Sequence, residues 1–236
     1  MAILGVLFDW RGTLVRDPDD EWWLRTALSR LGRQVSDAEI HDVVDRLRAA
    51  QERPDVVAAR VGADCSAERH RDAATVLFGA AGLDRELSDV LYGLDFEPAA
   101  HPLYEDVPGT LTRLKALGVA VAVVSDIHFD LRPEFAWLGL DAMVDYFALS
   151  FEHGIEKPDP RIFLRAVEAL GIEPGETLMV GDRPGRDGGA VDAGITTLLL
   201  PAGNGPTRGL DAVVALVRSS GSAASSGPGP WRRHEQ

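Results

Sequence analysis

Four groups of polar residues in this chain could together perform chemistry on a phosphoryl group. Each group directly follows an apolar run or lies in the loop beyond one. They are Asp9, Ser125 with Asp126, Lys157, and Asp182 with Asp187. An aspartate carboxylate can attack phosphorus and carry the phosphoryl group as a covalent intermediate. A lysine and a hydroxyl can hold the phosphoryl oxygens during the transfer.

The same carboxylates predict a metal ion. Asp9, Asp182 and Asp187 would repel one another if they converged without a cation between them. Hard oxygen ligands with few or no histidines suit Mg²⁺. We therefore expect Mg²⁺ as the cofactor, Asp9 as the nucleophile, and Lys157 and Ser125 as ligands of the phosphoryl group. The chain contains only two lysines, so it offers few candidates for this cationic role.

The elements that must position these residues alternate between strands and helices. Apolar runs predict strands at 3–8, 119–124, 143–150, 177–180 and 195–200. Helical periodicity and capping residues predict helices at 108–117, 132–138, 160–170, 187–193 and 209–217. This alternation predicts an α/β fold with a Rossmann-like parallel sheet flanked by helices. The carboxyl ends of such strands meet at one crevice, which would bring the four groups together.

The segment 18–98 has a different pattern, because it is almost wholly helical. Acidic residues at 19–21 open one predicted helix, and Ser36 with Glu39 forms a capping box for a second. Two further helices are expected, one capped by Ser66 and one over 85–94. Residues 219–230 contain only Ser, Gly, Ala and Pro, a composition typical of a disordered tail.

In order and spacing, these motifs resemble the haloacid dehalogenase (HAD) superfamily of hydrolases. The four matching segments are 8–14, 123–126, 156–163 and 181–194. The resemblance implies an α/β core at 1–15 and 100–217, an inserted helical cap of the first cap class at 16–99, and a tail at 218–236. It also implies that Asp126 and Lys157 help bind phosphate, that Lys157 is catalytic, and that the main-chain carbonyl of Arg11 is a further metal ligand.

Arg11 is where the chain departs from the family pattern. The resemblance implies an aspartate two residues after the nucleophile, which protonates the leaving alcohol and then activates water. A guanidinium stays protonated and can do neither. General acid–base catalysis contributes roughly 10²–10⁴-fold to a rate, so we expect weak activity on simple phosphate monoesters.

Three functions stay open at this point. The first is a Mg²⁺-dependent phosphohydrolase or phosphotransferase that forms an aspartyl-phosphate on Asp9. Its leaving group would need little protonation, and Arg11 could hold a second anionic group of the substrate. The second is a dehalogenase-like hydrolase of carbon–halogen bonds, since such enzymes lack the second aspartate. The third is a catalytically degenerate binding or regulatory protein, in which Arg11 pairs with Asp9 or Asp182 and replaces the metal by charge.

Composition restricts the partners that we expect. The net charge is −13, with no basic stripe outside the C-terminal tail, which disfavours nucleic-acid binding. No apolar run reaches the length of a membrane span or follows the pattern of a signal peptide. We therefore expect a cytoplasmic protein that acts on a small phosphorylated molecule, without nucleic-acid or membrane partners. Nothing in the sequence indicates the oligomeric state.

Some residues near the motifs are expected to have plainer roles. We expect His128 at the surface and at least one of Trp22 and Trp23 in the core of the helical block. Asp187 could also cap the helix predicted after Gly181. The single cysteine, Cys65, allows no intramolecular disulfide.

Overall fold

One parallel sheet organises the α/β unit of the molecule. The computed structural model describes residues 2–201, 203 and 205–225. The strands are β1 (Gly5–Phe8), β2 (Ala120–Ser125), β3 (Tyr146–Leu149), β4 (Thr177–Gly181) and β5 (Thr196–Leu199). All pairings are parallel, in the order β3-β2-β1-β4-β5. This confirms the predicted fold class.

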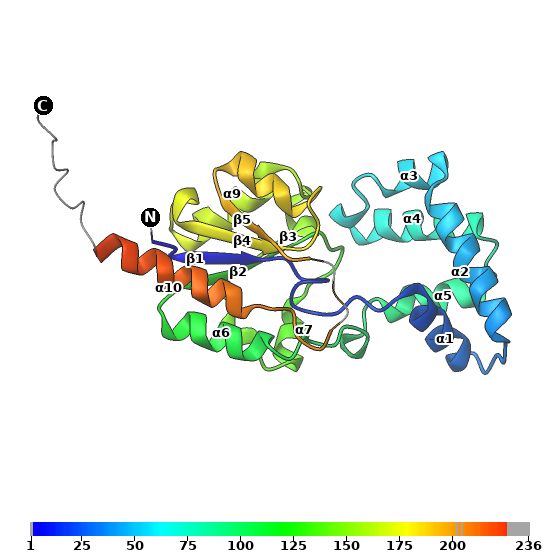
Figure 1. Ribbon diagram of the computed structural model, residues 1–236. Helices are drawn as coiled ribbons and strands as arrows, with labels where there is room; N and C mark the ends of the chain where they lie inside the picture. The colour runs from blue at the N-terminus through cyan, green and yellow to red at the C-terminus, as the bar shows by residue number, and fades with distance from the viewer. Residues whose placement is uncertain (1, 202, 204, 226–236) are drawn as a thin grey trace, which may run out of the picture.

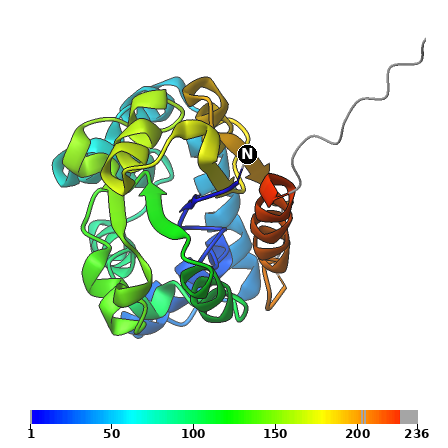
Figure 2. The same cartoon turned by 90° about the vertical axis from the view of Figure 1, so that its left-hand side faces the viewer.

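Helices cover both faces of this sheet. The α-helices of this unit are α6 (Val107–Ala116), α7 (Arg132–Trp137), α8 (Ser150–His153), α9 (Pro160–Leu170) and α10 (Asp211–Ser225). The segments between the helices and the strands contain the short 3-10 helices η3 (Asp141–Met143), η4 (Pro174–Glu176) and η5 (Asp187–Ala193). Helix α9 lies on one face, whereas α6 and α10 lie on the other (Figure 1). Seen from the amino end of the strands, the helices enclose the sheet on both sides (Figure 2).

The central strand β1 is buried on both faces, which explains its continuous apolar sequence. Val6 and Phe8 pack in one core with Leu111 of α6 and Val213 of α10. Leu7 points to the opposite face and packs in a second core that includes Phe163 of α9. Full burial of side chains of this size contributes about 1.5–3 kcal/mol each. These two cores fix the direction in which Asp9 leaves the sheet.

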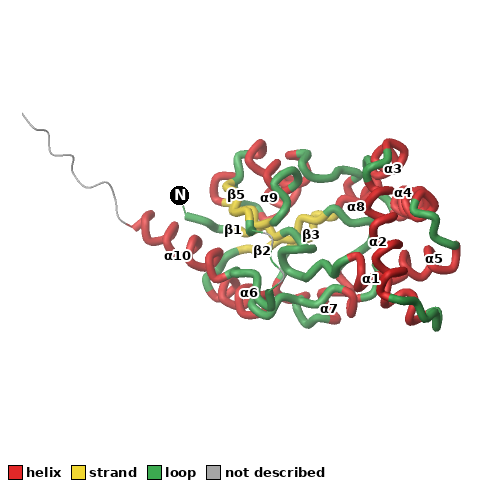
Figure 3. Tube along the Cα trace, turned by 45° about the vertical axis from the view of Figure 1, so that its right-hand side comes forward, coloured by secondary structure: helices red, strands yellow, loops and turns green. Residues whose placement is uncertain are grey.

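The helical unit lies beyond the carboxyl ends of the strands (Figures 1 and 3). It consists of α1 (Asp20–Arg30), α2 (Asp37–Gln51), α3 (Pro54–Arg60), η1 (Ala63–Cys65), α4 (Ala67–Ala80) and α5 (Arg85–Leu94). Leu24, Ile40 and Leu91 belong to its own hydrophobic core. The predicted capping box of Ser36 and Glu39 is present. Helix α3, which has Pro54 in its first turn, is an additional helix that the sequence analysis does not expect.

The two chain segments that join the units run side by side. Val15 forms an antiparallel bridge with Leu103, and the Arg16 N–H donates to the Pro102 carbonyl at 2.8 Å. The short 3-10 helix η2 (Pro98–Ala100) precedes the second segment. The helical unit is therefore inserted into the α/β unit through a single narrow connection.

Two expected boundaries are wrong. Helix α10 continues to Ser225, so the predicted tail at 218–236 begins too early; its remainder, 226–236, lies outside the described residues. Residue 143 belongs to η3 rather than to the third strand, which begins at Tyr146. The predicted helix at 187–193 is present with these bounds, as the 3-10 helix η5. Among the described helices, none combines the length and the apolar sequence that a membrane span requires.

Candidate functional site

The buried ammonium of Lys157 lies between two carboxylates at the ends of the central strands. Its Nζ donates to Asp9 Oδ1 at 2.5 Å and to Asp187 Oδ1 at 2.7 Å. All three residues are at most 6 % exposed. Burial opposes the charge of Lys157, but Asp9 and Asp187 outweigh it and raise the pKa of the amine. Burial raises the pKa of Asp9, and Lys157 works against that rise by favouring the carboxylate.

Asp187 also holds the loop that follows β4. Its Oδ2 accepts hydrogen bonds from the backbone N–H groups of Asp182 at 3.0 Å and Arg183 at 2.9 Å. A Cβ at Gly181 would lie 2.3 Å from this same oxygen, so only glycine fits there. Contrary to the expectation, Asp187 therefore does not cap a helix. Its side chain instead binds the backbone of the preceding loop, which fixes the position of Asp182.

Three carboxylates form a group suited to a hard cation. Asp9, Asp182 and Asp187 each offer an oxygen, and these oxygens lie within 4.8 Å of one another. Asp182 Oδ1 is buried and has no hydrogen-bond partner among the described residues. Gly12, at φ +78°, leaves room for this carboxylate, because a Cβ would lie 2.3 Å from Asp182 Oδ2. The oxygen-only donor set and the unpartnered oxygen both fit Mg²⁺.

Ser125 lies at the end of β2 and lines a cavity of about 250 Å³ together with Asp9 and Lys157. The Asp126 side chain also lines it, but its oxygens are engaged elsewhere. One accepts the Lys157 backbone N–H at 2.8 Å, and the other pairs with Arg186 at 3.2 Å. Burial raises the pKa of Asp126 to about 6. The carboxylate of Asp126 thus positions the Lys157 loop, and its contact with phosphate stays a prediction.

The Arg11 side chain turns away from these carboxylates and contacts the helical unit. Its guanidinium pairs with Asp95, the residue that follows α5, and lies over the Trp10 ring with 5.0 Å to the centroid. Arg11 therefore does not make the pairing with Asp9 or Asp182 that the degenerate alternative requires. The motif at 8–14 gave no hint of this, because the partner lies 84 residues away. That Arg11 offers its carbonyl to a metal remains a prediction.

His128 is buried, which corrects its expected surface position. It is 2 % exposed, and its ring stacks on that of His70 from α4, with centroids 3.5 Å apart and planes 7° apart. Burial, His70 and Arg11 lower its pKa to about 3. Both histidines line the Asp9 cavity. Trp23 is half-buried against the helical core, as expected of one of the two tryptophans.

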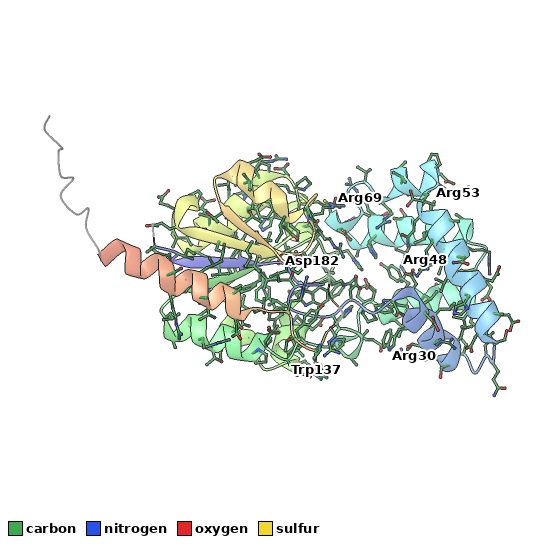
Figure 4. All side chains as sticks on the ribbon, in the orientation of Figure 1. Arg30, Arg48, Arg53, Arg69, Trp137 and Asp182 are labelled. Atoms are coloured by element: carbon green, nitrogen blue, oxygen red, sulfur yellow. The ribbon has the colours of Figure 1, made fainter. Side chains whose placement is uncertain are left out.

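The helical unit contributes residues to the cavity that sequence reasoning did not identify. They are Arg60, Asp64, His70 and Asp95. None belongs to a motif, and only the tertiary fold brings them to the strand ends. Figure 4 shows Asp182 at the boundary between the two units, where this cavity lies.

Comparison with known proteins gives a consistent result. The model of the haloacid dehalogenase-like hydrolase family matches residues 3–194. The phosphoserine phosphatase of Thermus thermophilus is 32% identical over 169 residues, 70% of this chain and 67% of that protein. The glyceraldehyde 3-phosphate phosphatase of Methanopyrus kandleri is 36% identical over 102 residues, 42% of this chain and 44% of that one. The chain thus spans about two thirds of the first relative and under half of the second.

Solved structures share the fold. A dehalogenase structure superposes with a TM-score of 0.66 at 24% sequence identity, covering 91% of this chain and 96% of the other. At this identity the likeness concerns the arrangement of elements rather than the reaction.

Proposed function

The chain belongs to the haloacid dehalogenase-like hydrolases, and from this premise we propose that it is a Mg²⁺-dependent phosphohydrolase or phosphotransferase. The proposal rests chiefly on the group Asp9, Asp182 and Asp187, in which one buried oxygen of Asp182 lacks a partner among the described residues. Lys157 at the same place supplies the positive charge that a phosphoryl group requires.

In the proposed reaction, Asp9 attacks phosphorus and the bond from phosphorus to the leaving group breaks. Lys157 favours the ionised form of Asp9 and orients it through Oδ1, and Thr13 Oγ1 lies 3.4 Å from Oδ2. Ser125 and Lys157 hold the phosphoryl oxygens. Asp9, Asp182 and Asp187 would hold Mg²⁺, which would supply charge neutralisation there. Water, or a second acceptor, then takes the phosphoryl group from Asp9.

The leaving group is restricted by Arg11. Without an acid at this position, an alkoxide would have to leave unprotonated, and the loss of general acid–base catalysis costs about 3–5 kcal/mol in the barrier. We therefore propose substrates with a weakly basic leaving group, such as acyl phosphates. We also propose that the helical unit acts as a cap. A second cavity of about 270 Å³, lined by Arg11, Arg60, Phe78 and Tyr92, lies under it and could hold the rest of a small substrate.

The other two candidates receive less support. A dehalogenase-like reaction is favoured by the missing second aspartate and by a haloacid dehalogenase relative that is 33% identical over 40% of this chain. It gives no role to the Asp182 oxygen that is unpartnered among the described residues. A degenerate binding protein is disfavoured because Arg11 pairs with Asp95 and leaves the Asp182 carboxylate to a metal ion.

Turnover of three phosphate substrates distinguishes these candidates. We expect Mg²⁺-dependent release of phosphate from acetyl phosphate and 4-nitrophenyl phosphate, and turnover of glycerol phosphate slower by about 100-fold or more. Asp9→Asn should abolish all three activities. Halide release from 2-chloropropionate without metal would instead support the dehalogenase. No turnover of any substrate, with no thermal stabilisation by millimolar Mg²⁺, would support the degenerate protein.

A further inference from the structure

A second group of potential metal ligands lies across the boundary between the two units. We propose that Asp64, His70 and His128, here named the junction cluster, bind a divalent transition-metal ion such as Zn²⁺ or Co²⁺. Asp64 belongs to η1 and His70 to α4, both in the helical unit, whereas His128 follows β2 in the α/β unit. One ligand atom from each residue lies within 4.8 Å of the others. An ion bound here would join the units.

The junction cluster contains polar atoms that otherwise lack a partner. Both ring nitrogens of His128 and Nδ1 of His70 are buried without a hydrogen bond among the described residues. His128 is 2 % exposed, so its ring has almost no contact with bulk solvent. A buried polar group without a partner costs about 1–3 kcal/mol. A ligand between the two histidines would remove this cost, and the Asp64 carboxylate, 3.7 Å from His70 Nε2, indicates that the ligand is a cation.

The donor set differs chemically from the group around Asp9. Two imidazoles and one carboxylate are typical ligands of Zn²⁺, Co²⁺ and related ions, whereas oxygen ligands alone suit Mg²⁺. Arg11 is near the cluster, but its charge is balanced by Asp95, whose Oδ2 also lies 3.8 Å from His128 Nε2. The two groups should therefore select different ions although Asp9 lines the same cavity as the junction cluster.

The backbone around Asp64 is already fixed to the α/β unit. Its N–H donates to Glu156 Oε1 at 3.0 Å, and its carbonyl accepts from Ser150 Oγ at 2.7 Å. The two imidazoles stack face to face, so sharing an ion requires one ring to turn out of the stack. His70, with a side chain 26% exposed at the edge of the cavity, has room to do so. Binding would then require the closed arrangement of the two units.

Titration of the full chain with Co²⁺ in saturating Mg²⁺ tests this site directly. Cobalt absorption in the visible range reports coordination by imidazole, and calorimetry with Zn²⁺ gives the affinity. We expect one ion per chain and affinity about tenfold weaker or worse in His70→Ala. His41→Ala removes an exposed histidine outside the cluster and should leave the affinity unchanged. Asp9→Asn with Asp182→Asn should also leave it unchanged, because those residues belong to the other group.

Two results would overturn the proposal. One is the absence of saturable Co²⁺ and Zn²⁺ binding; the other is equal affinity in wild type, His70→Ala and His41→Ala. His128→Asn provides a second variant of the cluster. Because His128 is buried, circular dichroism must show that this variant folds, and the His70 variant carries the test if it does not. None of these readouts depends on phosphatase activity, so the site can fail while the proposed function stands.

Discussion

Replacing Arg11 by aspartate tests the proposed function most directly. The new carboxylate would supply the acid and base that position 11 lacks, which is worth roughly 10²–10⁴-fold in monoester turnover. The same substitution removes the ion pair with Asp95 and brings two carboxylates together across the boundary between the units. The net change in rate is the balance of these two effects.

The exposure of the Arg11–Asp95 ion pair gives an estimate of the free energy that its loss would cost. The side chains of Arg11 and Asp95 are 24% and 16% exposed, so the pair is intermediate between a surface and a buried ion pair. Surface pairs contribute about 0–1 kcal/mol, and breaking a buried pair costs about 3–5 kcal/mol. A loss of about 1–2 kcal/mol would weaken closure of the helical unit about 5- to 30-fold. We therefore expect a net gain of about 3- to 2,000-fold in kcat/KM for glycerol phosphate.

The assay compares four proteins with glycerol phosphate and Mg²⁺: wild type, Arg11→Asp, Arg11→Asn, and Arg11→Asp combined with Asp95→Asn. The asparagine variant removes the ion pair without adding an acid, so its turnover should fall or stay low. The double variant relieves the repulsion and should exceed Arg11→Asp. Equal gains in Arg11→Asp and Arg11→Asn would show that the rate depends on opening of the units rather than on proton transfer, and our reasoning about position 11 would be refuted.

Further predictions concern stability, pH and the metal ion. Lys157→Met leaves two buried carboxylates unpaired and should lower the free energy of unfolding by about 3–5 kcal/mol in chemical denaturation, with partial recovery in Mg²⁺; an unchanged midpoint would contradict this. Burial raises the pKa of Glu134 from 4.5 to about 8. The protonated form is thus favoured in the folded state, and its stabilisation is present below pH 4.5 and lost as the pH rises through 8. Glu134→Gln should remove this decline, on the order of 5 kcal/mol, in unfolding curves across that range. Gly12→Ala would force a Cβ to 2.3 Å from Asp182 Oδ2 and should abolish thermal stabilisation by Mg²⁺. Gly32→Ala, at φ +64° but with no atom within 4 Å of the added Cβ, should retain that stabilisation.

Sequence reasoning located the part of the site that the sheet itself builds. Asp9 and Asp182 lie just beyond paired strands, since Phe8 is in register with Val180. Parallel pairing therefore brings them together wherever the strands form. Lys157 could be placed because so few lysines exist, although its loop position depends on Asp126 and not on a strand.

The remaining part of the site is formed by packing between the two units. Contacts of this kind produce no periodic pattern in the sequence from which they could be predicted. The position of Arg11 in the sequence is equally compatible with an ion pair to Asp9 or to Asp182. It pairs with Asp95 instead because α5 packs against this part of the α/β unit. His128 reads as a polar loop residue, yet His70, 58 positions earlier in the sequence, covers its ring. Composition also misled at 219–225, because apolar residues of α10 before this stretch pack on the sheet and the helix continues past them.

The bridge between Val15 and Leu103 has a consequence for how the chain folds and diversifies. Pairing of β1 with β2 joins segments more than a hundred residues apart, which is slow to achieve in an open chain. Once the two connecting segments pair, the helices between them form a closed loop. The chain that still separates β1 from β2 is then effectively short, which lowers the entropy cost of pairing the two strands. A different insertion between these two residues would preserve that shortcut. The helical unit, and with it every side chain that it contributes to the cavity beside Asp9, can therefore be exchanged or redesigned without rebuilding the sheet.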